Sequence, residues 1–361
     1  MRASQPVRVG FRCDVDVETG VGHLVRCVAL AEELLGRGVE VVFLSDLGGV
    51  EWAERQLSSR SIPVGQPAHA AADVSRQAAS LALDAVVLDG YRLDPETGRT
   101  LRRAGIVVLN VVDAEFGRQD ADIYLDQNLD SEHSSFAMPD GGERLAGIRY
   151  VLLRDVVRAE RPTTPRAPRT WAVLDVLAFF GGTDAFGAGP VVVPLILRTG
   201  APMHIRVVAP RPEIARQLEA LPTGQGQRVE ILGPRDDMPR LATTSDLVAA
   251  ASGSSAWELM CLGVTTAVVA VSDNQQVSYQ VLLDEGIALG LGRLDELRLG
   301  AKAQQLAVRD LSDLLRDHDR RAAMSALGWA LVDGRGRERV ADALMNQLAS
   351  RIRTLGPQGP T

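Results

Sequence analysis

Cysteine is scarce in this sequence. The 361 residues include only three cysteines, Cys13, Cys27 and Cys261, and they are too scattered to show the spacing of metal ligands. This usage is typical of a protein in a reducing cytoplasm. The five histidines form no H-x-H or H-E-x-x-H pair, so the sequence gives a zinc site little support and we expect no metal.

Long apolar runs and an excess of positive charge are also missing. No apolar run approaches the roughly 18 residues that span a bilayer, and a strand-like alternation starts before any signal-peptide pattern. The 39 Lys and Arg against 46 Asp and Glu give a net charge of −7. We therefore expect a cytoplasmic protein with no integral membrane segment and no nucleic-acid partner, although a local basic pocket stays open.

The composition is that of a globular protein with a sizeable core. Hydrophobic residues make up 46% and charged residues 24% of the chain. At a typical 100–200 residues per domain, the length predicts two domains or one large one.

The first half of the chain alternates short β-type runs with longer helical patterns. A run over 7–13 precedes a helical stretch over 22–35, and further runs cover 39–45, 85–88, 106–112 and 122–125. Polar residues follow where several of these runs end. This alternation predicts a doubly wound parallel α/β sheet.

A proline-rich stretch over 159–170 interrupts the alternation and is interpreted as a linker. After it, strand candidates follow at 173–180, 205–209, 229–232, 247–250 and 266–271, and the pattern is helical from Gly300 onward. We therefore predict an N-terminal α/β domain over 1–158 and a second one over 171–361 with a helical C-terminal extension. Such sheets bind ligands at the carboxyl ends of their strands, so function is expected in those loops, around a shared cleft.

The first motif is RCDVDVETGVGHLVRC, where a strand ends and Gly20 and Gly22 precede His23 and Arg26 at a helix start. Glycines allow close approach of a ligand, free N–H groups favour an anion, and the imidazole can act as a base or an acid. The guanidinium of Arg26 could also stabilise negative charge. The alternative is that His23 only makes a local hydrogen bond at the helix start.

The second motif is VVLDGY, which brings Asp89 and Tyr91 to a sheet edge. Asp89 could orient the imidazole of His23, and Tyr91 could bind a sugar or phosphate. The alternative is a simple Asp-Gly turn. Asp14, Asp113 and Asn128 stand at comparable strand ends.

The third and fourth motifs lie in the second half. LAFFGGTDAFG follows a strand with Gly181, Gly182 and Thr183, which suits a loop close to a phosphate, although neither a Walker A loop nor the three-glycine dinucleotide fingerprint is present. A simple Gly turn is the alternative.

LVAAASGSSAWELM ends a strand in small residues and hydroxyls, and a glutamate lies one turn into the helix that follows. The residues proposed to bind phosphate and ribose here are Ser252, Ser254, Ser255 and Glu258. Helix capping by Ser254 or Ser255 would explain the same pattern. Asn274 and Gln275 end another strand and suit base, ribose or sugar contacts.

Taken in order, R-x-D, G-x-G-H-x-x-R, D-x-Y, GGTD, the Trp-Glu loop and DNQ resemble the UDP-sugar hydrolase of pseudaminic acid biosynthesis and its relatives in spore-coat polysaccharide synthesis. The similarity covers Arg12 to Gly292 and includes YLDQN and YVLLRDVV. The wider group resembles the GT-B glycosyltransferases, which implies two Rossmann-like domains facing a cleft.

The resemblance implies a division of roles. UDP would bind the C-terminal domain at Gly182, Thr183, Ser254, Ser255 and Glu258, with Asn274 and Gln275 nearby. The residue at the position of His23 would activate water for attack on the anomeric carbon, and Asp14 and Tyr91 match further active-site positions. No metal is obligatory in that mechanism, and no cofactor is expected.

This sequence departs from the family pattern at two places. The usual D-H-Y is Asp89-Gly90-Tyr91, and the usual paired aspartates are Asp113 and Ala114. Three hypotheses follow: hydrolysis of a UDP-linked amino or deoxy sugar, glycosyl transfer from the same donor to an unknown acceptor, and nucleotide-sugar binding without turnover.

Overall fold

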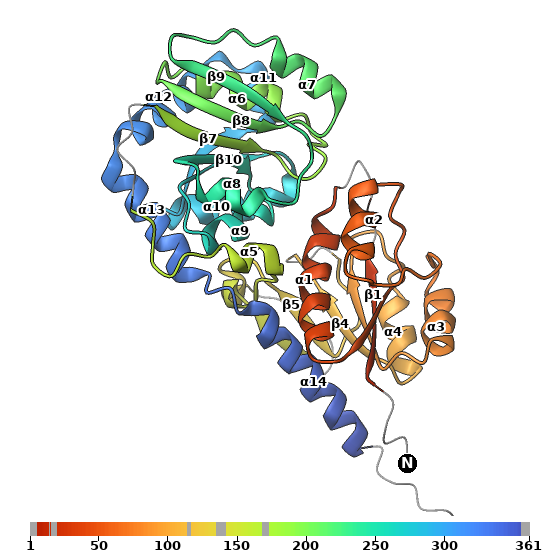
Figure 1. Cartoon of the computed structure of the whole chain (residues 1–361). Coiled ribbons are helices and arrows are strands. Elements are labelled where there is room, and N and C mark those ends of the chain that lie inside the picture. The colour runs from red at the N-terminus through yellow and green to blue at the C-terminus, as the bar shows by residue number, and fades with distance from the viewer. Residues whose placement is uncertain are drawn as a thin grey trace, which may run out of the picture. The chain divides into compact units, whose positions relative to one another are not determined.

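The computed structural model describes residues 6–13, 15, 20–113, 117–134, 142–167 and 173–354, apart from the side chains of Asn274, Ile352 and Thr354. By their contacts these residues form two units (Figure 1). The first unit comprises described residues of 1–16, 23–154 and 335–361, and the second comprises those of 17–22 and 155–334.

The first unit is built on a six-stranded sheet in the order β2-β1-β3-β4-β5-β6, with all neighbouring strands parallel. Strands β3 and β4 are buried along their whole length, as expected for a sheet covered on both faces. The strands are β1 (Arg8–Cys13), β2 (Glu40–Phe43), β3 (Ala85–Asp89), β4 (Val107–Val111), β5 (Ile123–Asp126) and β6 (Glu143–Ala146). The helices are α1 (Gly22–Gly36, in this unit from His23 on), α2 (Glu51–Ser58), α3 (Ala71–Ser80), α4 (Thr97–Arg103), α14 (Gly336–Thr354) and the 3₁₀ turns η1 (Ser131–His133) and η2 (Ile148–Tyr150).

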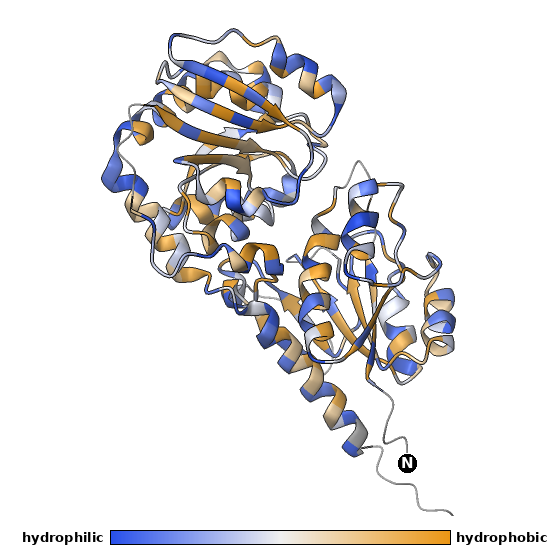
Figure 2. Ribbon diagram, in the orientation of Figure 1, coloured by the Kyte–Doolittle hydropathy of each residue, from blue (hydrophilic) through white to orange (hydrophobic). Residues whose placement is uncertain are grey.

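Helix α14 belongs to the first unit, although it comes from the far end of the chain. It packs on β4, β5 and η2, with Leu344 and Leu348 buried on its inner face. Its hydrophobic and hydrophilic residues alternate along its length (Figure 2). At its first residue, Gly336, a Cβ atom would lie 2.2 Å from the carbonyl oxygen of Val151, so a side chain would prevent this approach. The structure thus differs from the predicted 171–361 domain, which placed this helix in the second half.

The second unit has its own six-stranded parallel sheet, in the order β12-β11-β10-β7-β8-β9. Its strands are β7 (Leu174–Phe179), β8 (Met203–Val208), β9 (Gln227–Leu232), β10 (Leu247–Ala251), β11 (Thr266–Ala270) and β12 (Ala288–Arg293). Its helices are α5 (Asp155–Ala159), α6 (Gly189–Leu197), α7 (Pro212–Glu219), α8 (Met238–Thr243), α9 (Ser255–Cys261), α10 (Gln276–Asp284), α11 (Leu294–Leu299), α12 (Ala301–Arg316), α13 (His318–Leu331) and the 3₁₀ turn η3 (Asp273–Gln275). Helices α6 and α12 supply much of the apolar core against the sheet.

The predicted fold class of two doubly wound parallel sheets is confirmed, and each predicted strand is present to within a few residues. Two strands, β6 and β12, were missed. In the predicted linker, residues 160–167 form neither helix nor strand, while 168–170 lie outside the described residues.

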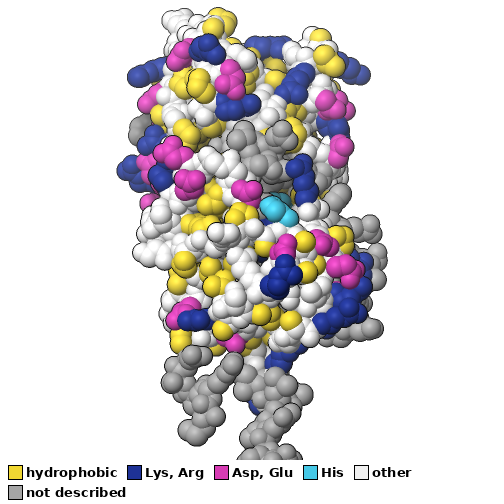
Figure 3. Space-filling model, turned by 90° about the vertical axis from the view of Figure 1, so that its right-hand side faces the viewer, with side chains coloured by type: hydrophobic (Ala, Val, Ile, Leu, Met, Phe, Trp, Pro, Cys, Tyr) yellow, Lys and Arg dark blue, Asp and Glu magenta, His cyan; other side chains and the backbone are white. Residues whose placement is uncertain are grey.

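The surface agrees with the mixed composition. Acidic and basic side chains alternate with small hydrophobic patches over the face drawn in Figure 3. In the described part of the chain, no helix is both long and apolar enough to cross a membrane.

Candidate active site

In each unit, the strand order reverses next to the first strand. In the first unit, β1 lies between β2 and β3, so the loops after β1 and β3 diverge to opposite sides of the sheet. In the second unit, β7 and β10 form the corresponding pair. Open α/β sheets bind ligands at such switch points, beyond the carboxyl ends of the strands. Four of the sequence motifs lie there: those at His23, Asp89, Gly181 and Ser252.

His23 and Asp89 form a hydrogen-bonded pair at the switch point of the first unit. Nδ1 of His23, near the start of α1, lies 2.7 Å from Oδ1 of Asp89, the last residue of β3. The Asp89 side chain is fully buried, whereas 14% of the His23 side chain is exposed. Because a carboxylate only accepts, the proton of this bond is on Nδ1 of His23, and in the neutral imidazole the lone pair is therefore on Nε2. The predicted contact between these two residues is present.

Arg26, one helical turn after His23, connects two buried carboxylates. Its Nε and Nη2 donate to Asp89 over 2.6 Å each, and its Nη1 and Nη2 donate to Asp113 over 2.9 and 3.0 Å. Both hydrogens of Nη2 are thereby used, so its 3.1 Å approach to Nδ1 of His23 does not compete for the Nδ1 proton. A guanidinium that bridges two carboxylates in this way fixes their geometry as well as their charge.

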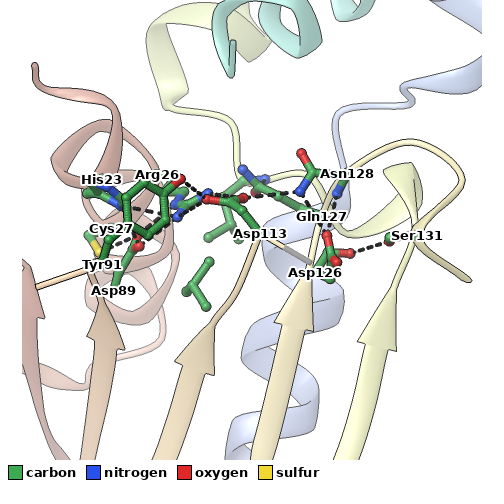
Figure 4. Close-up of polar contacts among 12 residues, drawn as sticks. His23, Arg26, Cys27, Asp89, Tyr91, Asp113, Asp126, Gln127, Asn128 and Ser131 are labelled. Atoms are coloured by element: carbon green, nitrogen blue, oxygen red, sulfur yellow. Dashed lines mark hydrogen bonds and ion pairs between the residues drawn. The ribbon is translucent and has the colours of Figure 1, made fainter. Parts of the chain in front are cut away.

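Asp113, which follows β4, continues this network to the next strands. The hydroxyl of Tyr91 donates to its Oδ2 over 2.5 Å, and Nδ2 of Asn128 donates to its Oδ1 over 3.1 Å. Asn128 also donates to Asp126, the last residue of β5, over 2.9 Å. The Tyr91 ring lies edge-on to the His23 ring, with 4.7 Å between centroids. Figure 4 shows these residues in a row along the strand ends.

Both carboxylates accept a full set of hydrogen bonds. Asp89 accepts from His23, twice from Arg26 and from Sγ of Cys27 at 3.6 Å. Asp113 accepts twice from Arg26 and once each from Tyr91 and Asn128. Burial by itself would raise the pKa of each carboxyl group, but the charge of Arg26 and these bonds hold the pKa of both Asp89 and Asp113 below the usual value. The two aspartates are therefore ionised and already satisfied.

The surroundings of Arg26 differ from those predicted. We expected its guanidinium to stabilise an anionic ligand, but it is buried and four of its N–H groups donate to carboxylates. Burial lowers and the two aspartates raise its pKa, with a net increase. Asp14, the other catalytic candidate of this unit, lies outside the described residues.

In the second unit, the loop after β7 contains the GGTD motif. Gly181 has φ +81°, a conformation that favours glycine, and Gly182 and Thr183 follow it. Asp184 is buried, and its carboxylate accepts from the backbone N–H groups of Ala188 and Gly189 over 2.7 and 3.0 Å. The first amides of α6 are thus occupied by the protein itself. An anion at this loop would have to meet the amides of Gly181–Thr183 instead.

Gly20 and Gly22 have contacts that group them with the second unit. Gly20 has φ +84°, and a Cβ on Gly22 would lie 3.6 Å from Oγ of Ser254. The structure thus brings the two glycines of the first motif beside the loops at the second switch point.

The loop after β10 contains the small residues of the fourth motif. Oγ of Ser252, which is fully buried, donates to Oε1 of Gln275 over 3.3 Å, and this ties the loop to the turn η3. Ser254 precedes α9, but its side chain makes no capping hydrogen bond, and Ser255 is the first helical residue. The Ser254 side chain therefore does not cap α9. Glu258 lies in the first turn of α9, and the side chain of Asn274 lies outside the described residues.

Sequence reasoning missed two members of the first unit's network and gave a third no specific role. Cys27 and Asp126 were not singled out, and Asp113 was noted only as a strand-end residue. Asp113 and Asp126 carry the same signal as Asp89, a carboxylate at the end of an apolar run. Among the described residues, no group of three or more His, Cys, Asp or Glu side chains could hold a metal ion.

By sequence, the chain is similar to a curated protein at low identity. No family model matches the chain. It is 22% identical to the spore coat polysaccharide biosynthesis protein SpsG of Bacillus subtilis, over 96% of this chain and 100% of that protein. The chain is thus a distant, full-length homologue of SpsG.

Solved structures decide the fold. The crystal structure of MurG from Acinetobacter baumannii is similar to this chain, with a TM-score of 0.68 and 18% sequence identity. The match covers 94% of this chain and 100% of MurG. The chain has a GT-B-like fold. Two further structures are similar to this chain. They are the spinosyn rhamnosyltransferase SpnG complexed with thymidine diphosphate (TM-score 0.61, 14% identity) and Anabaena HepE in complex with UDP and glucose (TM-score 0.60, 13% identity). Each match covers 94% of this chain and 100% of the other protein. The GT-B-like fold is thus shared with nucleotide-sugar enzymes, at identities that establish the fold alone.

Proposed function

We propose that this GT-B-like chain hydrolyses a UDP-linked amino or deoxy sugar to UDP and the free sugar, in surface-glycan or secondary-metabolite synthesis. The observation that carries the proposal is the His23–Asp89 pair, in which Nδ1 is committed to a buried carboxylate, so that the neutral imidazole has its lone pair on Nε2. A histidine held in this tautomer is suited to act as a general base.

The proposed reaction is a single displacement. Nε2 of His23 takes a proton from a water molecule while the water oxygen forms a bond to the anomeric carbon. The bond from that carbon to the diphosphate oxygen breaks, its electron pair leaves with UDP, and the configuration inverts. Asp89 stabilises the imidazolium that results, and Arg26 keeps Asp89 ionised and in place.

The proposal assigns the nucleotide to the second unit. The amides around Gly181, Gly182 and Thr183 and the hydroxyls of Ser252, Ser254 and Ser255 would hold the diphosphate, and Glu258 would accept from the ribose hydroxyls. Gln275, which is hydrogen-bonded to Ser252, and Asn274 would complete this site. Two structures that share the fold support a nucleotide site: that of SpnG contains thymidine diphosphate and that of HepE contains UDP.

Glycosyl transfer is the second candidate. The same histidine could deprotonate an acceptor hydroxyl instead of water, and SpnG, which shares the fold, is a rhamnosyltransferase. The first-unit network does not distinguish the two reactions, because both need the same base.

The test is UDP release from UDP-N-acetylglucosamine and UDP-diacetamido-trideoxyhexoses, with and without candidate acceptors, in H₂¹⁸O. Hydrolysis predicts UDP release without acceptor, with one ¹⁸O in the free sugar and none in UDP. Release that requires an acceptor and yields a new glycoside would favour transfer. If UDP raises the melting temperature but no sugar nucleotide is consumed, the chain is a non-catalytic binder and the proposal is wrong.

A further inference from the structure

The direction of each hydrogen bond in the first unit determines what the site offers to a ligand. Nδ2 of Asn128 donates to Oδ1 of Asp113 and to Oδ1 of Asp126, over 3.1 and 2.9 Å. Because carboxylates only accept, the amide nitrogen must face them, and both of its hydrogens are used. The amide oxygen of Asn128 points away from the two aspartates (Figure 4). Asn128 therefore presents an acceptor.

The donors of neighbouring side chains are also directed inward. The hydroxyl proton of Tyr91 is given to Asp113, and four N–H groups of Arg26 are given to Asp89 and Asp113. Within this network, these donors are committed to carboxylates, and of the five N–H groups of Arg26 only the second one on Nη1 is left.

The polar atoms of this network that face a ligand include two acceptors, Oδ1 of Asn128 and, in the neutral imidazole, Nε2 of His23. Nε2 of His23 and Oδ1 of Asn128 have no hydrogen-bond partner among the described residues, and both side chains are partly exposed. They come from the start of α1 and the end of β5. The network of Asp89, Asp113 and Asp126 and their partners spans the ends of β3, β4 and β5. This corresponds to two strand spacings, or about 10 Å.

We propose that this site recognises hydrogen-bond donors on the sugar, and that Asn128 is the residue that sets this specificity. This inference rests on the proposed function, in which the sugar binds the first unit. Oδ1 of Asn128 would accept from a hydroxyl or amide N–H group of the sugar. Phosphate and other groups that only accept would be disfavoured, because they would meet an acceptor with no donor in return.

The experiment measures binding, so it does not depend on turnover. Affinities for UDP, UDP-N-acetylglucosamine, and analogues of the latter that lack one substituent at a time (3-deoxy, 4-deoxy, 6-deoxy and the 2-deoxy sugar without the acetamido group) would be determined by calorimetry. For the wild-type chain we expect at least one loss of a donor to weaken binding about tenfold or more. Leucine is similar in volume to asparagine and its side chain has no polar atom. In Asn128→Leu, the ratio of the affinity for UDP-N-acetylglucosamine to that for the weakened analogue should therefore fall to about threefold or less.

Asn346→Leu is the matched control, because Asn346 is exposed on α14 and lies outside the network. It should keep the wild-type ratios. Because ratios within one variant are compared, a general loss of affinity in Asn128→Leu does not affect the result. If Asn128→Leu fails to fold, Asn128→Ala takes its place.

Several results would overturn the inference. They are equal affinity for UDP and its sugar derivatives, equal affinity for all the analogues, or a ratio that Asn128→Leu leaves unchanged. Hydrolysis without discrimination between the analogues would refute this inference and leave the proposed function intact. Discrimination without hydrolysis would refute the proposed function and leave this inference intact.

Discussion

At the scale of single residues, the central feature is Arg26 between two buried aspartates. Its placement gives Asp89 and Asp113 a shared counter-charge, so that the aspartates can hold His23, Tyr91 and Asn128 without themselves binding a ligand. In the proposed function, Arg26, Asp89 and Asp113 are therefore positioning residues, and His23 is the group that touches the reacting water.

The first prediction separates catalysis from nucleotide binding. His23→Ala should lower UDP release by roughly a hundredfold or more while UDP affinity stays nearly intact, because only the base is lost. Glu258→Ala should instead weaken UDP binding. Steady-state kinetics and calorimetry with UDP check both, and His133→Ala, at an exposed histidine paired with Asp130, is the control. Equal effects of the two substitutions on UDP affinity would contradict the assignment.

The second prediction concerns the stability of the network. Arg26→Met leaves Asp89 and Asp113 as buried carboxylates without their shared cation, which should cost about 3–5 kcal/mol of unfolding free energy. Arg55→Met removes an exposed pair with Glu51 and should cost less than about 1 kcal/mol. Chemical unfolding of both variants is the measurement. Similar losses in both would show that the buried bridge contributes no more than a surface pair.

At the scale of elements, the sequence predicted the strands that are apolar throughout and missed those that are not. Apolar runs such as 85–88 and 106–112 predicted β3 and β4, because a strand buried on both faces must be apolar throughout. Strands β6 (ERLA) and β12 (ALGLGR) escaped because one is short and half polar and the other contains two glycines. The pairing of Arg26 with Asp113, 87 residues apart, has no local signal at all.

The GGTD loop shows how an element can change the interpretation of a motif. The sequence suggested that the residues before α6 bind phosphate, yet Asp184 itself accepts from the amides of Ala188 and Gly189 at the helix start. Burial raises the pKa of Asp184 and these two amides oppose that increase. Asp184 therefore anchors the loop that contains Gly181–Thr183 rather than extending the binding surface.

This leads to the third prediction. Asp184→Ala removes the acceptor for two helix amides and should destabilise the second unit by about 0.5–2 kcal/mol. It should also weaken UDP binding, since the proposed diphosphate loop loses its anchor. Thermal melting with and without UDP checks both effects. If UDP binding is unchanged while stability falls, the loop does not contact the diphosphate.

At the scale of the whole molecule, the chain is not divided at one point. It leaves the first unit after Arg154 and returns to it at Arg335, so that α14 completes the unit in which the chain began. The helical pattern from Gly300 onward predicted helices at this end of the chain, but such a pattern does not say which surface the apolar face of a helix covers. In the structure, Arg337 of α14 pairs with Glu32 of α1 in addition to the apolar contacts.

The last prediction follows from this placement. Leu344 is fully buried on α14, which packs on β4, β5 and η2, so Leu344→Ala should cost about 2–5 kcal/mol. Because those contacts lie in the first unit, native-state hydrogen exchange should speed up in β4 and β5 and stay unchanged in β7–β12. Leu299→Ala, at a side chain that is 92% exposed, is the control and should change neither. Faster exchange confined to β7–β12 would instead assign α14 to the second unit, as its position in the sequence suggested. The reason is that the loss of an apolar contact first lowers the local stability of the elements that made the contact.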